Sequence, residues 1–334
     1  MPHPFDAVLV IAFGGPQGPD DIRPFLANVL RGRRVAPERV EEVAHHYELF
    51  GGVSPLPALT HRQAIALAKR LADRGAALPV YVGMRNWDPY LRDTLAQMSR
   101  HGVRRAVGFI AAAHRSYSSC TQYRENVAAA RAAIRQEGLA DVEITFVGDW
   151  HTHAGFLDAN AAHIRAALDT LPAEVRDDAQ IVFTAHSIPK GMADQYPYER
   201  QVHESAEGVM LRLTAGSAAT APERTSRIAF QSRSGRPEDP WLGPDICDYL
   251  REARNQRVPA VVVSPIGFLC DHVEVLYDLD VEAAQVARES GLPMARANAV
   301  NDHRAYIETM TEAVVSVCER YAAGRPLPLL PRVP

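Results

Sequence analysis

An acidic stretch in the last quarter of the chain carries the residues best suited to chemistry. Asp271, Glu274, Asp278 and Glu282 recur at spacings of three, four and four residues, beside His272. Residues three or four positions apart share one face of a helix, so this spacing predicts a row of carboxylates. Like charges in such a row repel each other, so folding stability alone does not favour it. Carboxylate oxygens beside an imidazole suit the binding or passage of a divalent cation.

The place of this stretch in the chain argues against the alternative, a solvated acidic helix face. It directly follows the apolar run 260–268, which is typical of a strand. In open α/β sheets, ligands bind at the carboxyl ends of the strands. His186, in the segment FTAHSIP, also follows a predicted strand, and an imidazole there can accept a proton or bind a metal. We therefore expect His186 and Glu274 to face each other across one site.

Other motifs have both a functional and a structural interpretation. The sequence GGP after the first predicted strand lacks the pattern of a phosphate-binding loop, so it favours a tight turn. The sequence RGRR at 31–34 is suited to a ligand's carboxylates, although alone it favours a solvated loop. Trp87 and Trp241 with Tyr47 could line a pocket for a flat ligand, whereas core packing is the usual role of Trp.

Composition narrows the class of protein. The 334 residues are 47% hydrophobic and 23% charged, as in ordinary soluble globular proteins. The net charge of −4, without a basic block, gives no reason to expect a nucleic-acid partner. No apolar run approaches the roughly 20 residues that span a membrane, and the first residues lack signal-peptide features. We therefore expect a cytoplasmic protein without a membrane anchor, whose four scattered cysteines are free thiols.

Short apolar runs alternate with longer segments of helical periodicity, which indicates parallel sheets covered by helices on both faces. We predict strands at 8–13, 80–84, 106–111, 143–147, 180–184, 227–231, 261–266 and 294–299. We predict helices at 59–74, 90–100, 122–136, 155–171, 199–214, 245–254, 281–290 and 304–322. The fold class is thus α/β, with two Rossmann-like domains, each a four-stranded parallel sheet flanked by helices. A boundary near Trp150 leaves an inter-domain cleft between the carboxyl ends of the strands.

Together these segments resemble the ferrochelatases, lyases of haem biosynthesis that insert iron into porphyrins. The matching segments, in family order, are VLVIAFGGP, HYELFGGVSPL, GMRNWDP, SYSSCTQYREN, FTAHSIP, AFQSRSG with PWLGP, and SPIGFLCDHVEVLYDLDVE. Each segment is weak alone, but the ordered set is specific. The resemblance implies chelatase-type domains, which we place at 1–150 and 151–302, with a C-terminal helix at 303–323 joining the first.

The resemblance also implies roles for individual residues. His186 and Glu274 are expected to be the catalytic pair and the residues that contact the metal, although which takes metal and which takes protons is open. The residues expected to contact the porphyrin are Ser54, Tyr123, Tyr47, Arg31 and Phe13. The residues expected to form a path for metal ions or protons are Asp278, Glu282 and His272.

Within the family, the start of the chain is most similar to actinobacterial-type enzymes that use coproporphyrin III and produce coproheme. The implied substrates are coproporphyrin III and Fe²⁺, and the resemblance leaves open an interaction with a downstream enzyme of the haem pathway. The alternatives are a protoporphyrin IX ferrochelatase, a cobalt or nickel chelatase, and a non-enzymatic haem-binding protein.

Two departures from relatives matter. Some relatives carry Tyr, an axial ligand to the product iron, where this chain has Phe13, which cannot ligate. Many actinobacterial relatives bind a [2Fe–2S] cluster through C-terminal cysteines, but no cysteine follows Cys318 here. We therefore expect no iron–sulfur cluster and no tightly bound cofactor, since Fe²⁺ is a substrate.

Overall fold

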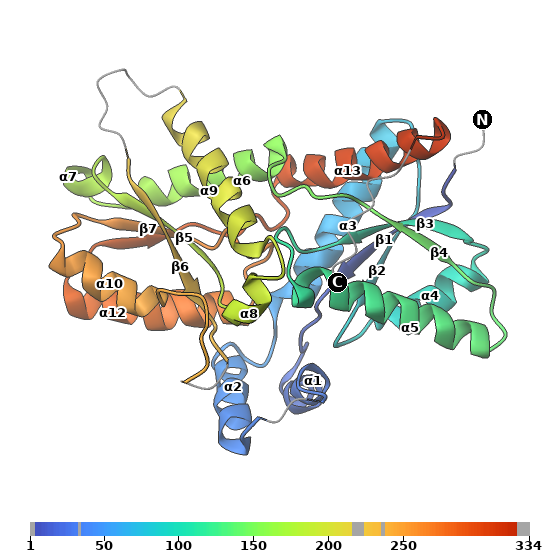
Figure 1. The fold of residues 1–334 in the computed structure, drawn as a ribbon, viewed down its shortest axis with the longest axis horizontal. Helices are drawn as coiled ribbons and strands as arrows, with labels where there is room; N and C mark the ends of the chain where they lie inside the picture. Colours follow the sequence, from blue (N-terminus) through green and yellow to red (C-terminus); the bar gives the residue numbers. More distant parts are fainter. Residues whose placement is uncertain (1–3, 33–34, 216–223, 235–237, 326–334) are drawn as a thin grey trace.

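Two parallel four-stranded sheets form the frame of the molecule (Figure 1). The structure is a computed structural model and describes residues 4–32, 35–215, 224–234 and 238–325. The first sheet has the order β2-β1-β3-β4 and the second β6-β5-β7-β8, with every strand pair parallel. The strands are β1 (Ala7–Ala12), β2 (Val80–Met84), β3 (Arg105–Ile110), β4 (Glu143–Phe146), β5 (Gln180–His186), β6 (Ser226–Gln231), β7 (Val261–Ser264) and β8 (Met294–Arg296). The predicted α/β class and its two sheets are confirmed.

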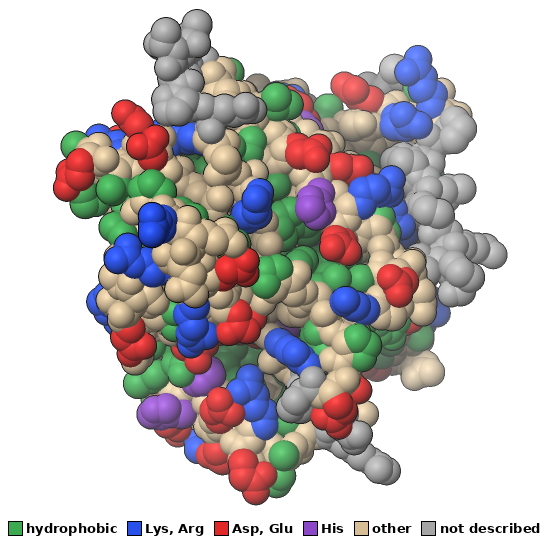
Figure 2. Space-filling model, turned by 60° about the vertical axis from the view of Figure 1, so that its left-hand side comes forward, with side chains coloured by type: hydrophobic (Ala, Val, Ile, Leu, Met, Phe, Trp, Pro, Cys, Tyr) green, Lys and Arg blue, Asp and Glu red, His purple; other side chains and the backbone are tan. Residues whose placement is uncertain are grey.

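Helices cover both faces of each sheet, so the central strands are continuous apolar runs rather than alternating ones (Figure 1). All six residues of β1 are buried. The covering helices are α3 (Pro55–Asp73), α4 (Leu91–Arg100), α5 (Gln122–Gln136), α6 (Ala154–Leu168), α9 (Tyr198–Thr214), α10 (Ile246–Asn255), α12 (Ala284–Ser290) and α13 (Arg304–Ala322). The face in Figure 2 carries acidic and basic side chains interspersed with apolar ones, rather than one area of a single charge.

The sequence did not predict α1 (Ile22–Val29) and α2 (Pro37–Leu49), which project below the sheets (Figure 1). They pack through a small apolar cluster that includes Phe25, Tyr47 and Val273. Further short helices are η1 (Pro19–Asp21), the π-helix η2 (Tyr117–Thr121), α7 (Ala173–Arg176) and α8 (Lys190–Ala193). Since α1 has only eight residues, with Pro24 in its first turn, its periodicity gives a weak sequence signal.

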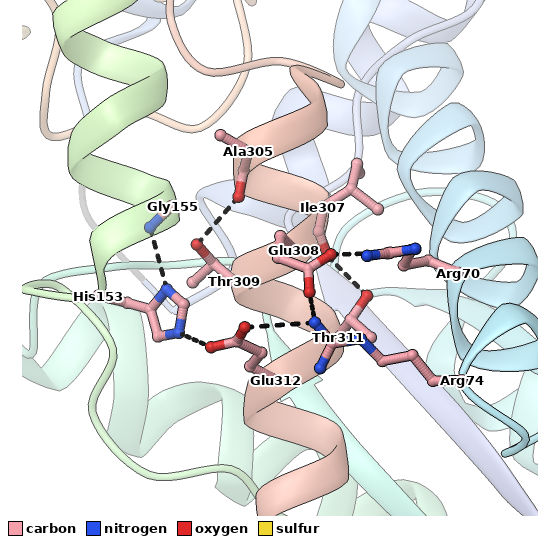
Figure 3. A network of polar contacts seen from close by, with 10 residues as sticks. All are labelled: Arg70, Arg74, His153, Gly155, Ala305, Ile307, Glu308, Thr309, Thr311 and Glu312. Carbon is pink, nitrogen blue, oxygen red and sulfur yellow. Dashed lines mark hydrogen bonds and ion pairs between the residues drawn. The ribbon is translucent and has the colours of Figure 1, made fainter.

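The last helix, α13, lies between α3 and α6 and joins the two halves of the chain. One apolar core includes residues of both sheets together with Tyr306, Met310 and Val314 of α13. On the polar side, Glu308 accepts a hydrogen bond from Arg70 at 2.7 Å and pairs with Arg74, while Glu312 lies 2.8 Å from His153 Nε2 (Figure 3). The predicted boundary near Trp150 falls between the strands of the first sheet and those of the second. The apolar core nevertheless includes side chains from both sheets.

The close approach of α6 and α13 depends on Gly155. A Cβ at this position would overlap the carbonyl oxygen of Ala305 and lie 2.8 Å from the Thr309 hydroxyl. His153 caps α6 through its Nδ1, which accepts a hydrogen bond from the Gly155 N–H at 3.2 Å (Figure 3). The His153 imidazole therefore caps the start of α6 and also pairs with Glu312 of α13.

Candidate active site

His186 is the last residue of β5, at the carboxyl end of the second sheet. Its Nδ1 lies 2.5 Å from the carbonyl oxygen of Ser187. A carbonyl oxygen only accepts hydrogen bonds, so Nδ1 carries the hydrogen and Nε2 of the neutral ring keeps its lone pair. Nε2 lies 3.9 Å from Oε2 of Glu274, and about a third of each side chain is exposed. The structure thus brings the predicted pair together with a basic nitrogen facing a carboxylate.

Several contacts fix the backbone that holds His186. The Tyr198 hydroxyl donates a hydrogen bond to the His186 carbonyl at 2.9 Å. The Ser187 hydroxyl donates to the carbonyl of Leu242 at 2.7 Å. Gly267, in the loop after β7, passes so close to β5 that a Cβ on it would lie 2.6 Å from the Cα of Ala185. The backbone on both sides of the imidazole is therefore held in place.

Asp271 does not belong to the row of helical carboxylates, so that part of the prediction is wrong. The helix begins only at α11 (Val273–Val275). Asp271 precedes it and accepts hydrogen bonds from Arg296 at 2.7 Å and from the side-chain amide of Asn301 at 2.6 Å. These partners use the carboxylate to hold the loop, which leaves Glu274, Asp278 and Glu282 as the row.

Glu274 lies on α11, whereas Asp278 and Glu282 lie on a π-helix, η3 (Leu276–Ala283), which continues α11 and leads into α12. Its i→i+5 hydrogen bonds widen the turn, so residues four positions apart are closer to alignment than on an α-helix. His272 caps the start of this helix: its Nδ1 accepts a hydrogen bond from the Glu274 N–H at 3.2 Å. Burial, the largest effect, lowers the pKa of His272, while Glu274 raises it. His272 therefore fixes the backbone of Glu274.

Asp278 is half-buried and lies four residues after Glu274 on the continuing helix. It accepts hydrogen bonds from Ser232 and, at 3.3 Å, from the amide of Gln231, the last residue of β6. Removal from water, the largest effect, raises the pKa of Asp278 to about 7. The hydrogen bond from Ser232 lowers this pKa, whereas the negative charges of Glu274 and Glu282 raise it further. Burial followed by Asp245 also raises the pKa of Glu282. Asp278 can thus gain and lose a proton near neutral pH.

Two buried tyrosines lie near the pair from the other half of the chain. Burial raises the pKa of Tyr123, on α5, to about 12, with Arg85 opposing and Glu274 adding to the rise. Burial followed by the charge of Glu274 also raises the pKa of Tyr47, on α2. The carboxylate of Glu274 acts on both phenols, so the site is built from both sheets.

Phe13 and Arg85 lie beside Tyr123. The Arg85 guanidinium is 5.4 Å from the centre of the Tyr123 ring and 5.9 Å from that of Phe13, which directly follows β1. Sequence reasoning did not select Arg85, although it lies in the segment GMRNWDP. Phe13 packs edge-on against Phe25 of α1 at 6.2 Å.

Ser54 and Arg31 occupy the loops around the first half of the site. Ser54 is buried and caps α3, and a Cβ on Gly15 would lie 2.7 Å from its hydroxyl oxygen. Arg31 is exposed at the end of α1 and donates a hydrogen bond to Asn28 at 2.7 Å. The contacts of Ser54 and Arg31 are thus with their own loops and helices, and Arg33 and Arg34 lie outside the described residues.

A stacked pair that the sequence did not predict joins α2 to the π-helix. The rings of His46 and Tyr277 lie 3.5 Å apart at an interplanar angle of 13°. Burial lowers the pKa of His46, followed by the charge of Arg39, which favours the neutral ring that stacks here. The helix that carries Tyr47 is thus tied to the helix that carries Asp278.

The arrangement offers a nitrogen base and a carboxylate across a short gap, beside a carboxylic acid that titrates near neutral pH. Imidazole and carboxylate together suit a borderline cation such as Fe²⁺. Within the described residues, no three His, Cys, Asp or Glu side chains form a group that could hold a metal ion. The four cysteines, all in described segments, are free thiols as predicted. No described helix is long and apolar enough to cross a membrane.

Solved structures of chelatases share this fold. SirB from Bacillus subtilis, solved with Fe³⁺, superposes with a TM-score of 0.58 over 96% of this chain and 98% of its own, at 9% identity. DR2241 from Deinococcus radiodurans, a multi-domain protein with structural similarity to chelatases, gives a TM-score of 0.51 over 92% of this chain and 54% of its own, at 17% identity. At these identities the likeness concerns the fold alone.

Several proteins are far more similar to this chain in sequence than these two structures are. A coproporphyrin III ferrochelatase of Streptomyces griseus is 45% identical over 97% of this chain and 88% of its own length. Proteins of the same description from Streptomyces coelicolor and Mycolicibacterium smegmatis are 47% and 43% identical, over 89% and 93% of this chain and 81% and 89% of their own lengths. The sequence model of the family described as Ferrochelatase matches residues 5–317. With this match over nearly the whole chain and the two-sheet site described above, the protein belongs to the ferrochelatase family.

Proposed function

We propose that this protein inserts Fe²⁺ into coproporphyrin III to give coproheme and two protons. The observation that carries the proposal is the opposition of His186 Nε2 and the Glu274 carboxylate at 3.9 Å, at the carboxyl end of β5. The choice of porphyrin is supported by relatives at 43–47% identity that are described as coproporphyrin III ferrochelatases.

Metal insertion must remove two pyrrole protons and bring the cation onto the ring nitrogens. We assign proton acceptance to His186, because its Nε2 has a free lone pair while Nδ1–H is held by the Ser187 carbonyl. Glu274, as the anion of the pair, attracts the cation. Asp278, whose pKa is about 7, exchanges the released protons with Glu282 and solvent.

The porphyrin-contacting residues Ser54, Tyr123, Tyr47, Arg31 and Phe13 remain proposals of the same kind. Tyr47 and Tyr123 are supported best, since the charge of Glu274 acts on both phenols. Coproporphyrin III brings four carboxylates, and Arg31 is exposed at the end of α1, where it can meet one of them. Phe13 offers an apolar ring and no ligand to the product iron.

The deciding experiment is an anaerobic insertion assay with Fe²⁺ and either coproporphyrin III or protoporphyrin IX, followed by absorbance. We expect faster turnover of coproporphyrin III. Preferred turnover of protoporphyrin IX would replace the substrate assignment, and binding of both without insertion would favour a haem-binding protein. Cobalt and nickel in the same assay test the remaining alternative.

Two variants test the pair. His186→Ala and Glu274→Gln should each lower kcat by at least about a hundredfold while porphyrin binding persists, because general acid–base groups contribute on that scale. His203→Ala, exposed on α9, and Glu289→Gln, exposed on α12, are matched controls. Normal turnover of either site variant contradicts the assignment.

The finer expectations follow from the same proposal. We propose that the enzyme works in the cytoplasm without a resident cofactor and delivers its product to a later enzyme of haem synthesis. Iron and sulfide analysis of the purified protein checks the first point: stoichiometric sulfide would contradict the expected absence of a [2Fe–2S] cluster.

A further inference from the structure

A cavity lies at the carboxyl ends of β3 and β4, and neither His186 nor Glu274 is among its lining residues. Its volume is about 30 Å³, and its polar lining includes His114, Arg115, Arg124, Cys120 and Asp149. This is the edge of the first sheet where α/β folds bind ligands. A space of this size holds an occupant somewhat larger than one water molecule.

Three polar atoms of the lining residues are buried and have no hydrogen-bond partner among the described residues. They are Nε of Arg115, Nε of Arg124 and Nδ1 of His114. A buried polar group without a partner costs about 1–3 kcal/mol, so three of them on residues that line one cavity favour an occupant that satisfies them.

The hydrogen-bonding role of His114 follows from its neighbours. His114 is 3% exposed, and its Nε2 lies 2.9 Å from the hydroxyl oxygen of Ser205. That hydroxyl donates its single hydrogen to the His151 carbonyl at 2.8 Å or the Gln201 carbonyl at 3.0 Å. With two carbonyl acceptors in reach of that one hydrogen, we assign Nε2 of His114 as the donor to Ser205, which leaves Nδ1 as an unpartnered acceptor.

The charges of the cavity favour an occupant with one negative charge. Arg115 lies 3.2 Å from Asp149, and the Arg124 guanidinium lies 4.6 Å from the centre of the Phe146 ring. Two guanidinium groups and one carboxylate leave a net charge of +1. Burial holds the pKa of His114 far below its usual value, at about 3, so this ring adds no charge.

We propose that the cavity binds a small monoanion that also carries a hydroxyl group, of the chemical class of bicarbonate. Two of its oxygens accept hydrogen bonds from the Nε–H groups of Arg115 and Arg124, and its hydroxyl donates to Nδ1 of His114. The segment at 117–124 lines one side of the cavity and leads to Tyr123 of the main site. Occupancy would therefore stabilise the start of α5. The proposal stands independently of the catalysed reaction.

The test compares bicarbonate with nitrate, which has the same planar shape and charge but no hydrogen to donate. Calorimetric titration of the intact protein at mildly alkaline pH should give saturable bicarbonate binding, and nitrate should bind at least about tenfold more weakly. Equal binding of the two anions, or no saturable binding of bicarbonate, overturns the proposal.

Variants connect that binding to the cavity. Arg124→Lys keeps a charge but loses the Nε–H donor, and it should weaken bicarbonate binding about tenfold. Arg135→Lys, on the outer side of the same helix beside Asp141, should bind like the wild type. Should Arg124→Lys fail to fold by circular dichroism, Arg115→Lys replaces it. Unchanged affinity in a folded cavity variant would also overturn the proposal.

Discussion

At the scale of single residues, one backbone carbonyl sets the chemistry of His186. The Ser187 carbonyl holds the hydrogen on Nδ1 and so directs the basic lone pair of Nε2 toward Glu274. Tyr198 supports this geometry from outside the site, since it binds the carbonyl of His186 rather than its ring. We class Tyr198 as a positioning residue.

Tyr198→Phe should lower kcat roughly fivefold with little change in KM, because the lost hydrogen bond is worth about 1 kcal/mol and loosens only the base. Steady-state kinetics measures the split. Tyr249→Phe is the matched control, because its hydroxyl binds Gln180 at the opposite end of the same strand. It should cost comparable stability but leave kcat unchanged. An equal kcat loss in both variants would reduce Tyr198 to a general structural role.

The raised pKa of Asp278 predicts that the free energy of unfolding falls as the pH rises. Its folded pKa of about 7 lies above the usual 3.8, so the folded state binds the proton more tightly than the unfolded chain. The stabilisation is complete below the usual value and is lost as pH rises through about 7, with a slope of at most about 1.4 kcal/mol per pH unit. Asp278→Asn should remove this slope in urea titrations across the range. A variant that keeps the wild-type slope would contradict the raised pKa.

The residue types were enough to predict His186, Glu274 and the carboxylates that follow Glu274. They were not enough to predict the residues that position this pair. His186 and Glu274 could be selected because their side chains can react and both follow predicted strands. Arg85, Tyr198 and His46 act through distances between elements remote in sequence, and no local pattern encodes those distances. Asp271 was misassigned because spacing alone cannot tell where a helix begins.

At the scale of elements, all eight described strands were predicted from the sequence, whereas the helices α1 and α2 were not. The predicted strand at 80–84 and the helices at 122–136 and 304–322 match β2, α5 and α13 in their bounds. Buried parallel strands are short apolar runs, and α13 has a continuous apolar stripe, so both give strong signals. Neither π-helix, η2 nor η3, was predicted from the sequence.

The stack of His46 on Tyr277 should couple α2 to the π-helix. In a double-mutant cycle with His46→Ala and Tyr277→Ala, we expect a coupling energy of about 1 kcal/mol in the free energy of unfolding. His45→Ala, whose side chain is exposed, replaces His46→Ala in the control cycle. Coupling indistinguishable between the two cycles would mean that the stacked pair does not hold the helices together.

At the scale of the whole molecule, the shared core makes the two sheets one cooperative unit. Met310 of α13 is fully buried within a core that receives side chains from β1 and β5. Met310→Ala should therefore cost about 2–5 kcal/mol and lower the stability of both sheets equally. Hydrogen exchange at amides of β1 and β5 measures this, with exposed Glu319→Ala as the control. A loss confined to one sheet would show two independent units.

The placement of α13 also has a consequence for synthesis of the chain. The ribosome makes β1, α3 and β3 well before Tyr306 and Met310, which complete their side of the core. Until then the first sheet must expose apolar surface that its own half cannot cover. We therefore expect the first half of the nascent protein to finish folding only after α13 has left the ribosome.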